Sequence, residues 1–414
     1  MKSKILDGVK VLDFGTYVAG AAISMVLAKM GAEVIKIEHP TKVDGGRYFL
    51  AVPGASAPDA RIGAEIFSAA NIGKKSLSVD VQQDEGREIV FDLIKQADIL
   101  IENMSPGSMV KRGLGYEAVR AVNPGIVYLS SSSCGQTGPE SFFVGYAPTF
   151  AQKSGLGHLT GYPGTPPSNF ITSIDMRSAT MSIGAVLAAL FHRRATGKGQ
   201  YIDLASQEAI AFNLGDCYLD YIVNGDEQGC SGNRREGFAP QDAYPTSGSD
   251  EWVAVSVSND EEWAGLCRAM DRSELVDDPR FATYRQRVEN ADALDSLISA
   301  WTQGRDNYAA AEALQRYGVP SAPCLNSEGC FNDGYYRERG VFVELEHRQT
   351  GRDFNLSCPW RFSEAETGVT TSAPLLGEHT VMVLKNKLGV DDDRIAELAD
   401  KRVIRRLFDY DNPF

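Results

Sequence analysis

The stretch that decides the fold is residues 171–205, which read ITSIDMRSATMSIGAVLAALFHRRATGKGQYIDLA. Small and apolar residues fill positions 178–191, and such a continuous run predicts a buried helix. Gly197 and Gly199 follow this run and are typical of a helix C-terminal stop. The β-rich residues 201–204 then predict a strand, so the stretch reads as a core helix followed directly by a strand of the sheet.

Both ends of this expected helix carry charges that suit the helix dipole. Asp175 lies in the first turn, and the basic residues 192–194 lie in the last turn. A carboxylate held at the positive end of a helix stays ionised and can act as a nucleophile. The alternative is an acid that only offsets the dipole. The apolar run is shorter than the roughly 20 residues that cross a bilayer, so we expect no membrane span.

The amino-terminal part of the chain opens with a βαβ unit. We expect a strand at residues 9–14, an alanine-rich helix at 18–30 and a second strand at 33–38. The loop after the first strand contains Gly15 and Gly20 but no GxGxxG fingerprint. This loop therefore counts against a plain dinucleotide-binding module.

The alternation of strands and helices continues up to the strand at residues 126–130. It predicts a parallel sheet with helices on both faces, in which ligands bind where loops leave the carboxyl ends of the strands. The corresponding loops are residues 15–20, 39–47, 103–113 and 131–146.

The composition changes after the strand at 201–204. Residues 224–245 are rich in Gly, Asn, Asp and Arg and are typical of a linker or loop. Strand- and helix-forming segments follow and predict a smaller α+β domain. We therefore expect three parts, namely the first part of a large domain at residues 1–223, a linker and small domain at 224–330, and a C-terminal part at 331–414 that returns to the large domain.

Composition and charge narrow the classes of partner. Of the 414 residues 43% are hydrophobic, and the net charge is −14, which argues against nucleic acid or an acidic membrane surface. A polyanionic ligand would need a local basic patch. The seven cysteines form no CxxC pair, and Lys2 and Lys4 precede no apolar segment, so we expect reduced thiols and a cytoplasmic location. The five histidines have no metal-ligand spacing, and no metal site is expected.

Eight strings between Gly8 and Thr380 match a known family in the order in which that family has them. They are GVKVLDF, GAEVIKIEHP, NIGKKSLSVD, ADILIENMSPG, GLGYE, GQTGP, TGKGQYIDLA and PLLGEHT. The chain thus resembles the family III CoA transferases, which include formyl-CoA, carnitine and benzylsuccinate CoA transferases. The resemblance implies a Rossmann-like α/β large domain, a smaller α+β domain and an interlocked, obligate dimer, either of two identical chains or with a homologous subunit.

The resemblance also implies the chemistry. In this family the catalytic residue is an aspartate ahead of the helix that leads to TGKGQ, and Asp175 holds that place. Its carboxylate would attack the thioester of an acyl-CoA such as succinyl-CoA, and CoA would pass through an aspartyl-CoA thioester to a second carboxylic acid. Coenzyme A enters as part of the substrate, and neither a metal nor a redox cofactor is required.

Carrying the family's CoA site over position by position gives a set of expected contacts. They are Tyr17, Val18, His39, Lys74, Asn103, Met104, Lys111 and Tyr146. Lys74 and Lys111 could pair with phosphates, and the alternative for each is a solvated surface charge. The alternatives for Asn103 and Met104 are a loop cap and a core filler. The family's glycine-rich loop corresponds weakly to residues 229–237.

Several departures from the family pattern keep other functions open. The chain has Val18 where members often have glutamine, Ala21 where they have proline, Ser105 where a basic residue is common, and Ala147 where they have an acid. One alternative is therefore a CoA-binding but weakly active or non-catalytic subunit of a heteromeric transferase. An α-methylacyl-CoA racemase is disfavoured, because Tyr146 replaces the histidine that racemases need as an acid or base.

The segments that border Asp175 suggest which class of acid accepts the CoA. An apolar acceptor pocket could be formed by Val18, residues 157–159, Tyr162 and Phe170. This set favours a hydrophobic or aromatic acid over formate or oxalate.

Overall fold

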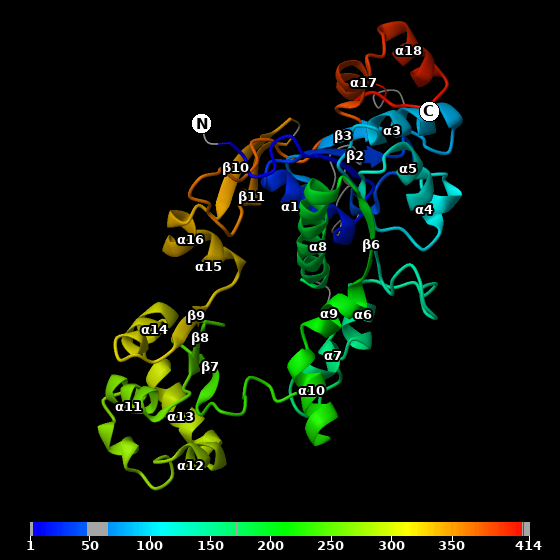
Figure 1. Cartoon of the computed structure of the whole chain (residues 1–414). Coiled ribbons are helices and arrows are strands. Elements are labelled where there is room, and N and C mark those ends of the chain that lie inside the picture. Colours follow the sequence, from blue (N-terminus) through cyan, green and yellow to red (C-terminus); the bar gives the residue numbers. More distant parts are fainter. Residues whose placement is uncertain (1–2, 48–64, 171–172, 349, 408, 410–414) are drawn as a thin grey trace. The chain divides into compact units, whose positions relative to one another are not determined.

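The structure is a computed structural model that describes residues 3–47, 65–170, 173–348, 350–407 and 409 (Figure 1). These residues form two compact units. The first unit contains residues 1–157, 169–225 and 340–414, and the second contains residues 158–168 and 226–339. Residues 171–172 of the stretch that decides the fold lie outside the described part.

A six-stranded parallel sheet forms the centre of the first unit. Its strands lie in the order β3 (Lys75–Ser78), β2 (Glu33–Glu38), β1 (Lys10–Asp13), β4 (Ile99–Glu102), β5 (Val127–Ser132) and β6 (Gln200–Ala205). Every neighbouring pair is parallel, so the expected doubly covered parallel sheet is confirmed.

Successive strand residues face opposite sides of this sheet and build two separate cores. Leu12, Ile35, Leu77 and Leu100 belong to one core, to which α3 (Asp84–Ile94), α5 (Tyr116–Val122), α17 (Thr380–Leu388) and α18 (Asp392–Asp400) contribute. Val11, Val34, Ile99 and Ile101 belong to the other core, which is covered by α1 (Ala19–Lys29) and α8 (Ile174–Thr196).

Helix α8 has the form that the sequence predicted. It begins at Ile174, ends at Gly197 with φ of 72°, and is followed by β6. Its 23 residues exceed the apolar run expected from the sequence, and by length and composition alone it could cross a membrane. One side of α8, with Ser178, Ala179 and Ser182, is buried, and α8 packs against α1. Small residues on both helices allow this close packing.

Smaller elements complete the first unit. They are a 3₁₀ turn at Gly45–Arg47, the helices α2 (Glu65–Asn71), α4 (Ser108–Lys111), α6 (Ala147–Lys153), α9 (Ser206–Phe212) and α10 (Gly215–Asn224), and the hairpin of β10 (Phe342–His347) with β11 (Gly351–Leu356). The short helix α7 (Leu156–Leu159) crosses the boundary between the units.

The second unit is the smaller α+β body. Its antiparallel sheet has the order β7 (Gln241–Pro245), β8 (Trp252–Ser256) and β9 (Ser321–Cys324). The helices are α11 (Asp260–Ala269), α12 (Tyr284–Glu289), α13 (Ala291–Thr302), α14 (Asn307–Gln315), α15 (Ser327–Asn332) and α16 (Gly334–Glu338), with a 3₁₀ turn at Ser273–Val276. Trp263, Phe281 and Leu266 are buried at the centre of its core.

Candidate active site

Asp175 lies in the first turn of α8, as expected. Among the described residues, its carboxyl group has no partner in a hydrogen bond or an ion pair. Burial alone raises the pKa of the Asp175 carboxyl to about 6. The lost hydration raises the pKa, whereas the positive end of the helix favours the charged form. At neutral pH about nine tenths of the group is still ionised. Asp175 is thus a carboxylate that is poorly solvated and has no cation beside it among the described residues. These are the conditions that favour a nucleophile.

The connection between α8 and β6 fixes the edge of the sheet at which Asp175 lies. A turn at residues 197–199 reverses the chain, so α8 runs antiparallel to the strand that follows it. The amino end of α8 is therefore on the side where the parallel strands end (Figure 1). The loops after β1, β2, β4 and β5 leave the sheet at this same edge. Asp175 and the loops expected to bind CoA share one side of the first unit.

The loop after β1 is held by Asn103, which directly follows β4. The side-chain oxygen of Asn103 accepts hydrogen bonds from the Thr16 backbone N–H at 2.7 Å and from the Thr16 hydroxyl at 3.3 Å. Its amide group donates to the Thr16 carbonyl at 3.0 Å. These bonds occupy the side chain, so Asn103 clamps the loop, which is the structural alternative that the sequence left open.

Tyr17 and Tyr146 form an aromatic pair at this edge. Their ring centroids lie 6.3 Å apart in an edge-to-face arrangement, and 37% of Tyr17 and 64% of Tyr146 are exposed. The two rings come from the loops after β1 and β5, so the sheet brings them together over 129 residues of sequence. Exposed rings that are fixed in place can stack on a planar ligand.

Val18 and Met104 are half-buried at the bases of their loops. Val18 is the N-cap residue of α1 and packs against the core below α1 and α8. Met104 packs against the opposite core, and its backbone N–H donates to the Glu102 carboxylate at 2.7 Å. Both side chains therefore contribute to packing at the edge of the site.

The ammonium of Lys74 is not free to make the phosphate contact that the sequence suggested. Its ammonium is fully buried and bonds the Asp13 carboxylate at 2.9 Å, the Ala21 carbonyl at 2.8 Å and the Asn71 side chain at 2.8 Å. Burial, only partly opposed by Asp13, lowers the pKa of Lys74 to about 8. All three donors of the ammonium are used inside the protein, so Lys74 ties the chain before β3 to β1.

The basic residues His39, after β2, and Lys111, after β4, differ in their exposure, since His39 is half-buried and Lys111 is exposed. Lys111 is exposed, and no described residue pairs with its ammonium. His39 accepts at Nδ1 from the backbone N–H groups of Thr41 and Lys42, which places its proton on Nε2, 3.4 Å from Asp80. Burial lowers the pKa of His39, Asp80 opposes this, and Lys42 and Arg112 lower it further.

That pKa effect identifies two cations that the sequence argument passed over. Lys42 and Arg112 both act on His39, although they come from different loops. The family resemblance pointed to Lys74 and Lys111 for the phosphates, but Arg112 directly follows Lys111 and Lys42 lies three residues after His39, so both are visible in the sequence. Together with Lys111 they lie on the two segments of the chain where a local basic patch for an anionic ligand is expected.

The residues expected to form an acceptor pocket do not all fall in one unit. Phe170 packs in the first unit against a core cluster that contains Ile174. Tyr162 and residues 158–159 belong to the second unit. There the Gly232 N–H donates to the Gly161 carbonyl at 2.8 Å, and the Cys230 thiol donates to the Tyr162 carbonyl at 3.1 Å. The loop at 229–237 therefore contacts the segment that leads toward α8.

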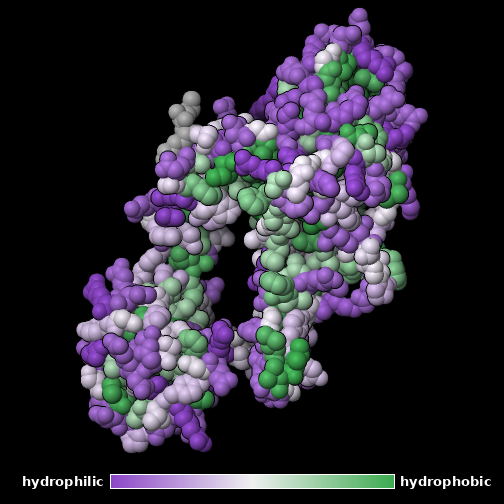
Figure 2. All heavy atoms as spheres, viewed as in Figure 1, coloured by the Kyte–Doolittle hydropathy of each residue, from purple (hydrophilic) through white to green (hydrophobic). Residues whose placement is uncertain are grey.

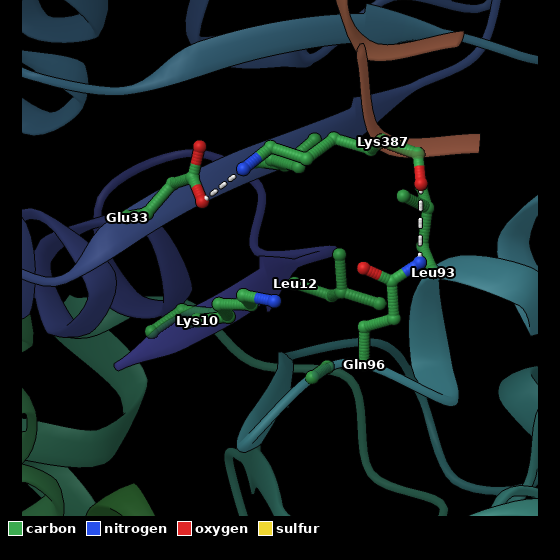
Figure 3. Close-up of a pocket in the computed structure, with 9 residues that line it drawn as sticks. Lys10, Leu12, Glu33, Leu93, Gln96 and Lys387 are labelled. Atoms are coloured by element: carbon green, nitrogen blue, oxygen red, sulfur yellow. Dashed lines mark hydrogen bonds and ion pairs between the residues drawn. The ribbon is translucent and has the colours of Figure 1, made fainter. Parts of the chain in front are cut away.

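A hollow of about 20 Å³ lies at the opposite, amino-terminal edge of the sheet (Figure 3). The Lys387 ammonium donates to the Glu33 carboxylate at 2.7 Å. The backbone carbonyl of Lys387 accepts from the Gln96 side-chain amide at 3.2 Å. The space suits one water molecule rather than a substrate. Within the described part of the chain, no three His, Cys, Asp or Glu side chains gather in a metal-binding group.

Comparison with known proteins identifies the family. The model of CoA-transferase family III matches residues 6–380. The chain is 32% identical over 403 residues to a succinyl-CoA–D-citramalate CoA-transferase of Chloroflexus aurantiacus, covering 96% of this chain and 98% of that one. It is 30% identical over 402 residues to the beta subunit of a succinyl-CoA–L-malate CoA-transferase of the same organism, with the same coverage of both chains.

A solved structure agrees with these sequence matches. The crystal structure of a CaiB/BaiF family protein from Brucella suis superposes with a TM-score of 0.83 at 30% identity, over 94% of this chain and all of that one. The likeness extends over both units rather than over the parallel sheet alone. The chain belongs to CoA-transferase family III and is an enzyme of that kind.

Proposed function

We propose that the protein transfers CoA from succinyl-CoA to a second carboxylic acid through covalent intermediates on Asp175. The observation that carries this proposal is the solitary carboxylate at the amino end of α8, which is poorly solvated and still ionised at neutral pH. The relatives named for succinyl-CoA support the choice of donor.

The proposed reaction balances without another reactant. The Asp175 carboxylate attacks the thioester carbonyl, the C–S bond breaks, and CoA leaves as a thiolate from a mixed anhydride. The thiolate then attacks the aspartyl carbonyl and releases the donor acid, which leaves an aspartyl-CoA thioester. The acceptor carboxylate repeats these two steps in reverse order, takes the CoA, and regenerates Asp175.

We assign binding of the CoA part to the loops at the carboxyl edge of the sheet. Tyr17 and Tyr146 would contact the adenine or the pantetheine arm, with Val18, His39 and Met104 around them. Lys111, Lys42 and Arg112 would pair with the phosphates. Asn103 contributes by holding the first loop, and Lys74 is not included because its ammonium is buried and fully bonded.

For the acceptor we propose a short dicarboxylic acid. The two relatives carry names for the dicarboxylates D-citramalate and L-malate. The sequence-based expectation of a hydrophobic or aromatic acid stays a prediction, and the division of its residues between two units gives it no added support. The two acceptor classes differ in one charged group, so a substrate panel separates them.

We further propose that the working form is a dimer. Helix α10 has no buried residue, and Leu219, Tyr221, Ile222 and Val223 on it are each at least 60% exposed. Figure 2 shows this helix as an apolar patch on the first unit. A patch of this kind on an otherwise acidic protein supports contact with another chain, either identical or homologous.

We propose the cytoplasm as the location of the protein, which the seven unpaired cysteines support.

A panel assay on the purified chain tests the proposal. Succinyl-CoA is incubated with malate, citramalate, glutarate, benzoate or a medium-chain fatty acid, and each new acyl-CoA is measured by chromatography. We expect exchange with at least one dicarboxylate, and a mass of two chains by light scattering. Exchange only with the apolar acids would refute the acceptor class. No exchange with any acid would favour the alternative of a subunit that needs a homologous partner.

Activity is expected to rise with pH through the pKa of Asp175. Only the ionised carboxylate can attack, and with a pKa of about 6 roughly one tenth of it is ionised at pH 5. We therefore expect kcat/KM to increase nearly tenfold between pH 5 and pH 7 and to level off above. The measurement is initial rates between pH 5 and pH 8 at constant ionic strength. A flat profile would contradict a nucleophile with this pKa.

A further inference from the structure

Six charged side chains lie buried beneath the loops after β1 and β2. They are Asp13, Lys36, Glu38, Asp44, Arg47 and Lys74, and each is at most 5% exposed. They form three ion pairs, each with a shortest N–O distance of 2.9 Å, namely Lys74–Asp13, Lys36–Asp44 and Arg47–Glu38. The three acids balance the three bases, so the cluster carries no net charge. Burying charge is costly, so the presence of this cluster is weak evidence for a role in stability alone.

The pair of Asp44 and Lys36 reaches the loop that carries Tyr17. The Asp44 carboxylate accepts hydrogen bonds from the backbone N–H of Tyr17 at 2.9 Å and of Gly46 at 2.8 Å. The Lys36 ammonium donates to the Gly15 carbonyl, two residues before Tyr17. The pair therefore binds this loop at the backbone N–H of Tyr17 and at the backbone carbonyl of Gly15.

The backbone conformation of Tyr17 is one that has to be stabilised by its surroundings. Its φ is 54°, in the left-handed region that residues other than glycine rarely adopt. A residue held there costs roughly 1–3 kcal/mol unless its surroundings enforce the conformation. The bond from the Tyr17 N–H to Asp44 is charge-assisted and thus stronger than a bond to a neutral acceptor.

The same turn also fixes the position of the Tyr17 ring. A Cβ on Gly45 would lie 2.2 Å from the Tyr17 hydroxyl oxygen, and a Cβ on Gly46 would lie 3.4 Å from the Tyr17 Cα. The ring thus lies directly against the backbone of Gly45. Both the backbone and the ring of Tyr17 take their positions from residues 44–46.

From this geometry we infer that Asp44, paired with Lys36, is a positioning residue that holds Tyr17 in place to receive CoA. This inference rests on the proposed function, because it assumes that Tyr17 contacts the CoA part of the substrate. Burial alone would raise the pKa of Asp44, but Lys36 and the two N–H groups lower it below its usual value. The acceptor for Tyr17 is therefore always the charged form near neutral pH.

Glu38 provides a matched control inside the same cluster. Its carboxylate pairs with Arg47 and accepts from the Ser76 hydroxyl at 2.7 Å. Glu38 is as buried as Asp44 and also belongs to an ion pair. The backbone N–H of Tyr17, however, donates its hydrogen bond to Asp44. A loss that comes only from weakening the buried cluster would affect Asp44→Asn and Glu38→Gln alike. A loss that comes from Tyr17 would affect Asp44→Asn alone.

The test compares CoA binding by calorimetry and steady-state kinetics in the full-length protein. For Asp44→Asn we expect the Kd for CoA and the KM for succinyl-CoA to rise by about tenfold to a hundredfold. We expect kcat to change little, because Asp175 is untouched. Glu38→Gln should keep the Kd and KM of the wild type, even if both variants unfold at a lower urea concentration.

Two further variants keep the inference testable if Asp44→Asn fails to fold. Lys36→Met/Asp44→Leu removes the pair as a whole, which a buried site tolerates better than one lone charge, and it also removes the acceptor for Tyr17. Gly45→Ala leaves every charge in place and pushes on the Tyr17 hydroxyl. Both should weaken CoA binding as Asp44→Asn does.

The outcomes separate this inference from the proposed function. If the wild type binds no CoA, the proposed function fails and this inference fails with it. If the wild type binds CoA, and the folded Asp44 variants and Gly45→Ala bind it equally well, only the positioning role is refuted. An equal loss in Glu38→Gln would also refute it, because the effect would then belong to the cluster as a whole.

Discussion

Replacing Asp175 by asparagine is expected to abolish CoA transfer. The amide cannot attack a thioester, and the loss of a covalent nucleophile reduces kcat by roughly 10⁴-fold or more. The free energy of unfolding should not fall, because the wild-type carboxyl has no described partner and its charge is poorly hydrated where it lies. A loss of activity without a loss of stability distinguishes a nucleophile from an acid that serves the helix.

Covalent trapping gives a direct measurement of this role. The protein is incubated with succinyl-CoA and hydroxylamine, which cleaves an activated aspartyl ester or thioester to a stable hydroxamate. Intact mass should show one hydroxamate in the wild type and none in Asp175→Asn, and peptide mapping should place it at residue 175. Asp84→Asn, the same change in the first turn of α3, is the matched control and should behave as the wild type.

Two results would contradict the assignment. A hydroxamate on another aspartate or glutamate would show that the nucleophile lies elsewhere in the chain. Full transfer activity in Asp175→Asn would leave this residue with the role of an acid that offsets the helix dipole.

Among the single substitutions considered, Lys74→Met is expected to lower the free energy of unfolding the most. The change leaves the Asp13 carboxylate buried with the Ser24 hydroxyl and the Gly15 N–H but without its paired cation. Breaking a buried ion pair from one side costs about 3–5 kcal/mol, because the remaining charge stays desolvated. Urea unfolding followed by circular dichroism measures the difference in the free energy of unfolding.

The adjacent lysine is the natural control for this prediction. Lys75 pairs with Glu33 near the surface, and both side chains are partly exposed. Lys75→Met should therefore cost less than about 1 kcal/mol. The double variant Asp13→Asn/Lys74→Met removes both charges and should recover much of the loss. Equal costs for the two single lysine variants would show that the buried pair has no special weight.

The sequence predicted the backbone well because its signals there are local. The apolar run and Gly197 place α8 and its end, and short β-rich segments place strands such as β2. Each of these features depends on a few neighbouring residues. The order of the eight family strings then gave the fold class and the family, and both are confirmed.

Side-chain roles were harder to predict because their partners lie far away in the sequence. Asn103 bonds Thr16 across 87 residues, and Lys74 bonds Asp13 across 61. A motif match shows that a residue has its family place, but not whether its polar atoms are free. Asp175 illustrates a second limit, since its pKa depends on how much water the folded chain removes, which a helix position alone does not reveal.

The balanced cluster beneath the first two loops has a consequence for how this enzyme can change over generations. Any one substitution that removes one of its six charges leaves a buried ion without a counterpart, and we expect selection to act against such variants. Paired replacements are tolerated, but they require two mutations whose separate effects are harmful. The buried cluster is therefore expected to evolve in coupled steps, whereas the exposed residues Lys42 and Lys111, which we propose as phosphate contacts, can change one at a time.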